Sequence, residues 1–220
     1  MLIDIHVHSS VSPCSRLELT EILTHARGRG LDGVCITDHD TMDARHSVME
    51  GVQPDGLLLV VGMEYSTSQG DFLLFGPFED LEPGLPATEM LHLVRNAGGA
   101  AIAAHPCRMV RPADPGLAAG GLLQAVELVN GRNSPHDNAS ARQWERGVIG
   151  NVLPRVAGSD AHTLQELGRA PTRFFKPVRS RGELIEALYK GRCGPAVPAP
   201  LPEYRHHRQH KRSWPFSAAI

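Results

Sequence analysis

Residues 2–10, LIDIHVHSS, and residues 33–40, GVCITDHD, each join a short apolar run to a cluster of histidine and carboxylate side chains. Between them, Ser15 and Glu18 form a capping-box pattern before a stretch of helical apolar spacing that ends at Gly28. A strand, a helix and a second strand in this order predict a βαβ unit with parallel strands. The polar cluster follows the carboxyl end of each strand.

The same alternation continues along the chain to about residue 190. A helical stripe over 90–97 ends at Gly98, and Ser180 with Glu183 caps a last predicted helix. Seven strands with intervening helices predict an α/β barrel; a doubly wound open sheet is the alternative, although neither a GxGxxG nor a GxxxxGK[ST] turn follows a strand. The strands are expected near residues 2–8, 33–37, 57–64, 72–76, 100–105, 124–130 and 153–158.

Length and composition predict one folded domain over residues 1–194 and a tail over 195–220. The hydrophobic fraction is 41% and the charged fraction 21%, which is ordinary globular usage and excludes a fibrous or disordered body. Four prolines between 195 and 202 break the regular pattern, and a basic stretch without an apolar face follows. We expect this Pro-rich, basic tail to be disordered, with a nucleic-acid or membrane-surface arm as the alternative.

The location and the partners are constrained by what the chain lacks. No apolar run approaches the roughly 18–20 residues of a bilayer span, and the first residues do not read as a signal peptide, so a cytoplasmic location is expected. Residues 196–220 carry four Lys or Arg and one Glu, which leaves 18 basic and 23 acidic side chains in the body. An acidic body argues against duplex DNA as the main partner. The scattered cysteines predict reduced thiols and no disulfides: Cys14, Cys35, Cys107 and Cys193.

Histidines and carboxylates gather where predicted strands end. In a parallel α/β barrel the carboxyl ends of the strands form one mouth, so residues distant in sequence converge there. Imidazole nitrogens mixed with carboxylate oxygens suit zinc, manganese or iron. The strand-end histidines are His6, His8, His39, His105 and His162, and the carboxylates are Asp38, Asp40, Glu64 and Asp160. The remaining body histidines are expected on the surface: His25, His46, His92 and His136.

Two of the motifs have the spacing of a shared site. In a strand, His6 and His8 point to one face, with Ile5 and Val7 opposite. Asp160 and His162 again stand two positions apart after a strand. Each motif alone is also compatible with polar residues that only end a strand, and it is their combination that predicts a metal centre.

The ordered set DIHVHSS, ITDHD, GMEYS, AAHP and GSDAH resembles the PHP (polymerase and histidinol phosphatase) family over residues 1 to about 165. The resemblance implies a distorted seven-stranded (βα) barrel, two or three divalent metal ions (Zn, Mn or Fe) and hydrolysis of phosphoesters. It also implies three metal sites: His6, His8, Glu64 and Asp160 for the first, Glu64 and His105 for the second, and His39 with His162 for the third.

Two positions depart from the family pattern. Where many members have a histidine after the glutamate, this chain reads GDFLLFG, which offers Asp71 as a substitute ligand or as a solvent-facing acid at a strand start. Where some members have a further ligand after HxH, this chain offers Cys14, which need not be a ligand. Whether the third site is filled depends on these positions.

The expected reaction is attack on phosphorus by a hydroxide that two cations generate from water. Arg108 and Arg132 follow predicted strands and could hold phosphate oxygens bidentately, or could be surface arginines; Asn130 could orient a ligand or substrate. The expected substrate is a small phosphoester of the nucleotide or sugar phosphate class. No membrane partner is expected, and nucleic acid is not expected as a partner except as a substrate. An amidohydrolase on the same barrel and a noncatalytic metal or nucleic-acid binding module are the alternatives, and the oligomeric state is left open.

Overall fold

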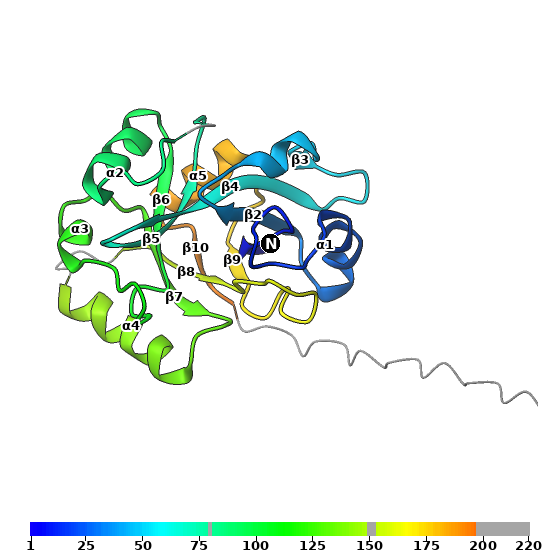
Figure 1. Cartoon of the computed structure of the whole chain (residues 1–220). Helices are drawn as coiled ribbons and strands as arrows, with labels where there is room; N and C mark the ends of the chain where they lie inside the picture. Colours follow the sequence, from blue (N-terminus) through cyan, green and yellow to red (C-terminus); the bar gives the residue numbers. More distant parts are fainter. Residues whose placement is uncertain (79–80, 149–152, 197–220) are drawn as a thin grey trace, which may run out of the picture.

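A single curled sheet builds the barrel, which the computed structural model describes over residues 1–78, 81–148 and 153–196 (Figure 1). Within these residues the strand order is β10-β9-β1-β2-β4-β5-β6-β7-β8, with the short β3 paired to β4. The strands are β1 Leu2–Val7, β2 Gly33–His39, β3 Gly51–Val52, β4 Leu58–Thr67, β5 Gly70–Phe75, β6 Ala100–Ala104, β7 Ala125–Asn130, β8 Arg155–Gly158, β9 Thr172–Phe174 and β10 Cys193–Pro195. The helices are α1 Leu19–His25, α2 Ala87–Asn96, α3 Pro115–Ala119, α4 Pro135–Val148 and α5 Arg181–Tyr189, with 3-10 turns at Arg27–Arg29 and Asp43–His46.

The sheet nearly closes on itself between its first and last long strands. The amide of His8 donates to the carbonyl of Ala161 at 2.9 Å, and the amide of Asp160 donates to the carbonyl of His6 at 2.8 Å. These bonds bring the segment after β8 back against the end of β1. The barrel predicted from the sequence is therefore confirmed, and the open doubly wound alternative is wrong.

Alternation along the strands produces two apolar clusters, one on each face of the sheet. Leu59, Val61 and Met63 of β4 belong to the outer cluster, which also contains buried residues of α1, α2, α3 and α4. Leu58 and Val60 belong to the inner cluster, which α5 closes with Leu184 and Leu188. Helices α2, α3 and α4 lie on one side of the barrel and α1 on the opposite side (Figure 1).

Strand direction and number differ from the expectation of seven parallel strands. β5 is antiparallel to both β4 and β6, and β3, β9 and β10 were not expected. β4 and β5 are joined by Ser68 and Gln69 alone, and a connection this short can only form a hairpin, because a parallel crossover needs about a dozen residues. The segment predicted at 72–76 exists, and its direction was wrong.

Helix caps were predicted with mixed success. The capping box of α1 joins Glu18 to Glu21, whereas the hydroxyl of Ser15 donates to the carbonyl of His8 at 2.9 Å; the predicted Ser15 cap was therefore wrong. At α5 the prediction is confirmed, since the hydroxyl of Ser180 accepts the amide of Glu183 at 3.2 Å.

The ends of the predicted domain fall partly outside the described residues. Pro195 closes the edge strand β10, so regular structure reaches one residue beyond the predicted boundary at 194. Residues 197–220 of the tail predicted over 195–220 lie outside the described residues, and the domain division stays a prediction. No helix in the described part of the chain is long and apolar enough to cross a membrane. All four cysteines are free, as expected.

Candidate metal centre

Four side chains from three parts of the chain point their donor atoms at one another at the mouth of the barrel. The Nε2 atoms of His6 and His8 lie 3.1 Å apart. Glu64 Oε2 is 3.3 Å from His6 Nε2 and 3.1 Å from His8 Nε2. Asp160 Oδ1 is 3.7 Å and 3.4 Å from the same two nitrogens. All four residues are buried.

These separations fit a single cation. A tetrahedral zinc ion with bonds of about 2.0–2.1 Å holds its ligands about 3.3–3.4 Å apart, close to the distances between these donors. Two imidazole nitrogens and two carboxylate oxygens face one buried point. The ionised carboxylates can only accept hydrogen bonds, so the four atoms cannot satisfy one another unless protons or a cation lie between them. The donor set therefore fits the first metal site that the family resemblance implies.

Glu64 reaches a second group of donors with its other oxygen. Its Oε1 lies 2.8 Å from His105 Nε2, while its Oε2 faces His6, His8 and His39. Nε2 of His105 is therefore the ring nitrogen that could bind a cation shared with this carboxylate. A carboxylate with one oxygen on each side is suited to bridging two cations.

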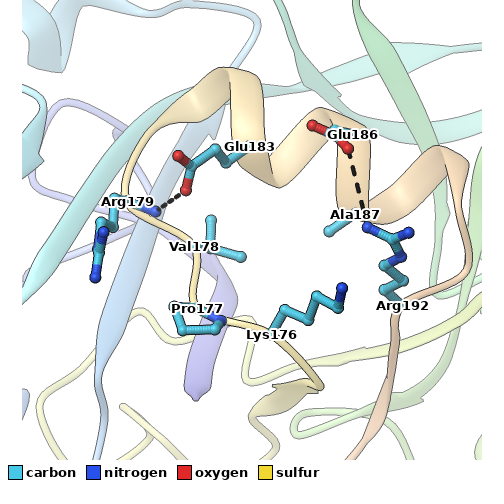
Figure 2. Close-up of a pocket in the computed structure, with 8 residues that line it drawn as sticks. All are labelled: Lys176, Pro177, Val178, Arg179, Glu183, Glu186, Ala187 and Arg192. Atoms are coloured by element: carbon cyan, nitrogen blue, oxygen red, sulfur yellow. Dashed lines mark hydrogen bonds and ion pairs between the residues drawn. The ribbon is translucent and has the colours of Figure 1, made fainter.

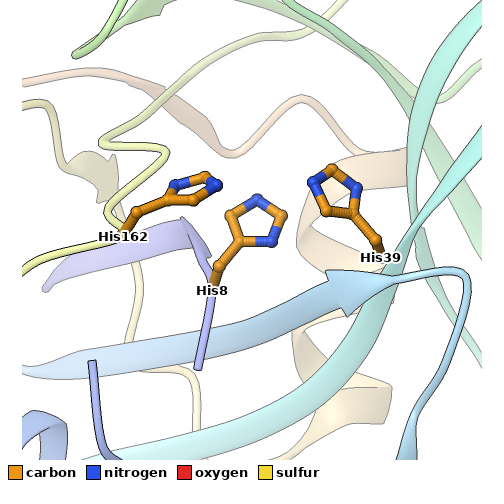
Figure 3. Close-up of side chains that lie close together, drawn as sticks. All are labelled: His8, His39 and His162. Carbon is orange, nitrogen blue, oxygen red and sulfur yellow. The ribbon is translucent and has the colours of Figure 1, made fainter. Parts of the chain in front are cut away.

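His39 and His162 flank His8 instead of meeting each other (Figure 3). The ring centres of His39 and His162 are 6.3 Å apart, and each lies within 4.5 Å of the His8 ring centre. The three rings offer nitrogens close enough for one ion. Because His8 Nε2 already faces the first group, a third cation would have to share His8 or recruit another donor.

Asp71 and Cys14 lie outside the groups that could hold a metal among the described residues. Asp71 lines one cavity together with the candidate ligands Glu64 and His105, but its Oδ1 accepts a hydrogen bond from Arg111 Nη1 at 2.9 Å. Cys14 is exposed on the loop after β1. Their proposed roles as ligands stay predictions. Of the histidines expected on the surface, His46, His92 and His136 are exposed, and His25 is half-buried.

Three arginines line the mouth of the cavity, which has a volume of about 190 Å³. Arg108 Nη2 donates to Asp160 Oδ2 at 2.7 Å and to Asn130 Oδ1 at 3.0 Å. Arg132 Nη1 lies 2.9 Å and 3.1 Å from the two ring nitrogens of His162. Arg111, the third, was not singled out in the sequence. The guanidinium groups thus stand directly beside the candidate ligands, and not on a remote surface.

Electrostatics keep the carboxylates of the cluster ionised. Burial alone would raise the pKa of Glu64, but the charge of His6 and bonds from His105, His6 and His8 hold it well below its usual range. Burial would likewise lower the pKa of His6, yet Glu127, Glu64 and Asp160 raise it well above its usual range. For His162, burial and the charge of His8 lower the pKa to about 4, so this ring is neutral at pH 7 and free to act as a ligand.

Backbone strain marks the same edge of the barrel. Within the described residues, three non-glycine residues have positive φ: Asp40 at 53°, His105 at 28° and Asp160 at 55°. His105 and Asp160 are themselves candidate ligands, and Asp40 directly follows the candidate ligand His39. Left-handed conformations of such residues cost about 1–3 kcal/mol and persist where the surroundings enforce them, often at functional sites.

The sequence reading missed Glu127, a fully buried carboxylate on β7. Its Oε1 lies 3.0 Å from His6 Nδ1, and its Oε2 accepts the amide of His105 at 2.8 Å. A signal was present, since Glu127 interrupts the apolar run AVELV at the strand period that faces inward. Asp38 was noted as a strand-end acid, but its partners Ser9 and Ser12 were not, although both hydroxyls donate to it at 2.6 Å.

Fold and site together define an α/β barrel whose mouth holds a His, Glu and Asp cluster able to bind divalent metals. Residues 4–105 match the model of the PHP domain, and residues 135–193 match the model described as PHP-associated. The chain belongs to the PHP family, as the motifs of the sequence predicted.

Several known proteins are similar to this chain in sequence or in fold. An uncharacterized protein of Methanocaldococcus jannaschii is 31% identical over 116 residues, which cover 48% of this chain and 68% of that protein. PsfC from Pseudomonas syringae has a TM-score of 0.70 at 20% identity over 90% of this chain and 91% of its own. A two-domain protein from Bacteroides vulgatus, containing a predicted PHP-like metal-dependent phosphoesterase, has a TM-score of 0.68 at 20% identity over 90% and 65%. The lesion-specific endonuclease EndoQ from Pyrococcus furiosus has a TM-score of 0.66 at 18% identity over 86% and 56%. At these identities the solved structures show the fold.

Proposed function

We propose that the chain hydrolyses a small phosphoester, of the nucleotide or sugar phosphate class, at a centre of two or three divalent cations. The observation that carries the proposal is the position of three arginines around the candidate metal ligands in one cavity. A phosphoryl group needs both kinds of partner, because its oxygens bind cations and guanidinium groups alike. The family assignment and the PHP-like neighbours support the reaction class.

The cations would be held by His6, His8, Glu64 and Asp160 at the first site, by Glu64, His105 and Asp71 at the second, and by His39 and His162 at the third. When bound, they would supply an activated nucleophile and neutralise the negative charge of the phosphoryl oxygens. Arg132 would hold a phosphate oxygen from the side of His162. Arg108 would do so from the side of Asp160, with its guanidinium oriented by Asn130 and Asn133.

The volume of the cavity supports a small substrate. About 190 Å³ suits one phosphoryl group and its immediate leaving group better than a folded macromolecule. One structural neighbour is an endonuclease Q bound to a 27-mer duplex with an abasic lesion, and another is an amidohydrolase from Chromobacterium violaceum with bound sulfate. Nucleic acid and amide substrates therefore belong in any test.

The test is a substrate panel on protein reconstituted with manganese, zinc or iron, before and after chelation. The panel holds nucleotides, sugar phosphates, a phosphodiester, abasic duplex DNA and amides. We expect turnover of a small phosphoester that chelation abolishes and added metal restores. Turnover confined to amides, or none with any phosphoester, would overturn the proposal. His136→Ala, an exposed histidine on α4, is the control for nonspecific histidine effects.

A further inference from the structure

Glu127 lies behind the candidate ligands, on the side away from the cavity lining, and is completely buried. A carboxylate in this position is costly unless its oxygens accept several hydrogen bonds. Its Oε1 pairs with His6 Nδ1, and its Oε2 accepts from the His105 amide and from Asn130 Nδ2 at 2.9 Å. Two of these three donors belong to candidate metal ligands.

We propose that Glu127 is the positioning residue of the metal centre, which fixes the tautomer of His6 and the place of His105 and so sets the metal affinity of both the first and the second site. With Nδ1–H directed to Glu127, the lone pair of His6 is on Nε2, the atom that faces His8, Glu64 and Asp160. Carboxylates in this relation to a histidine ligand raise its basicity and orient its ring. The inference rests on the metal site of the proposed function and not on its substrate.

The local backbone is arranged to admit this carboxylate. A bulge in β7 between Glu127 and Val129 lets Glu127 and Asn130, three residues apart, contact each other. On the neighbouring β8, a Cβ at Gly158 would overlap both Glu127 Oε1 and the Cβ of His6. Glycine at this position is therefore required by the pair of Glu127 and His6.

Glu127 also connects the ligands to the arginine that we place on phosphate. Asn130 donates to Glu127 and, through its Oδ1, accepts from Arg108 Nη2 at 3.0 Å. Arg108 in turn bonds Asp160. One buried carboxylate thus supports residues on both sides of the candidate metal.

The test measures metal affinity directly, by competition with a chromogenic chelator, in Glu127→Gln. A glutamine keeps the shape but offers one acceptor oxygen and an NH₂ where three donors converge, so one donor must lose its partner. We expect the dissociation constant of the tightest metal to rise about 10- to 100-fold, the range found when such partners are removed. Thr172→Val is the matched control, because it removes buried hydroxyl bonds to Ala157 on β8 without altering a ligand; its metal affinity should equal that of the unaltered protein.

Two further measurements separate positioning from a loss of folding. Gly158→Ala should weaken metal binding in the same direction, because it displaces Glu127 and His6 while leaving the carboxylate in the chain. In the unaltered zinc-loaded protein, long-range ¹H–¹⁵N spectra should show His6 protonated on Nδ1. An Nε2–H tautomer, or an unchanged metal affinity in folded Glu127→Gln, would overturn the inference. The metal-affinity and tautomer measurements use no phosphoester. They therefore test the role of Glu127 even if the proposed reaction is not found.

Discussion

The two ends of the barrel both carry a cavity lined with charged side chains, but the charges are arranged differently. At the amino-terminal end a cavity of about 290 Å³ lies between α5 and residues 176–179 (Figure 2). It is the larger of the two, yet Glu186 there pairs with Lys190 and Arg192, and Glu183 accepts the amide of Arg179. Each acid has its partner within the same short segment.

At the mouth the acids and histidines come from distant strands and leave their donor atoms facing one point. The amide of Val178 donates to Met1 Sδ, which places the α5 cavity beside the start of β1, whereas His6 and His8 stand at its end. In barrels of this kind the carboxyl ends of the strands carry chemistry and the amino ends carry stability. The mouth is therefore the candidate site because ligand atoms from distant strands face one point there, although its cavity is the smaller one.

The largest effect is expected when a ligand of the mouth is removed. His6→Ala and Asp160→Ala should each lose the first metal and lower phosphoester turnover by more than about 100-fold, because both donors lie within one set. Metal content by elemental analysis, measured beside turnover, checks this. His46→Ala, which alters a largely exposed histidine, serves as the control. Full metal stoichiometry in both ligand variants would refute the assignment.

A smaller effect is expected at the rim. Arg132→Ala should lower kcat/KM about 10- to 100-fold with metal content intact, since a hydrogen bond to a charged group contributes about 1.5–3 kcal/mol. Arg142→Ala, on the exposed side of α4, is the matched control. Unchanged kinetics in Arg132→Ala would place Arg132 with the solvent-facing arginines.

Asp71 should give an effect of a few-fold that depends on the metal. If it is a ligand, Asp71→Ala weakens the second site and Asp71→His shifts the preference from manganese towards zinc, because imidazole is the softer donor. Arg111→Ala removes the bonded partner of Asp71 without changing the carboxylate and shows what loss of the ion pair alone does. Equal turnover of the unaltered protein, Asp71→Ala and Asp71→His with either metal would exclude Asp71 from the site.

The amino-terminal end should respond in stability alone. Ser180→Ala removes the cap of α5 and should cost about 1 kcal/mol, which lowers the melting temperature by about 2–4 °C for a domain of this size. Turnover at 25 °C should stay within twofold of the unaltered protein. A larger kinetic loss would mean that the two ends are coupled.

Local patterns made most of the barrel predictable. The strand-end clusters in DIHVH, ITDHD and SDAH could be placed together because parallel strands align their carboxyl ends, and the structure brings their histidines within one site. The direction of β5 was missed because alternation locates a strand without giving its orientation. The length of the β4–β5 connection would have decided it.

The supporting residues were harder to foresee. The strand period marks Glu127 as an inward-facing acid, but its partners lie 121 and 22 positions away, and the sequence does not show that these contacts form. Arg111 was overlooked because it belongs to no strand-end motif and its partner Asp71 lies 40 positions away. Sequence motifs report the donors that face the metal, whereas the residues behind them are set by the packing of neighbouring strands.

The metal centre can be located by anomalous diffraction from crystals of the manganese-loaded protein. We expect a strong peak enclosed by His6, His8, Glu64 and Asp160, and a second one beyond Glu64 beside His105. Soaking with zinc should give peaks at the same places. If the protein turns over phosphoesters with metal but shows no peak between these four side chains, they do not form the metal centre.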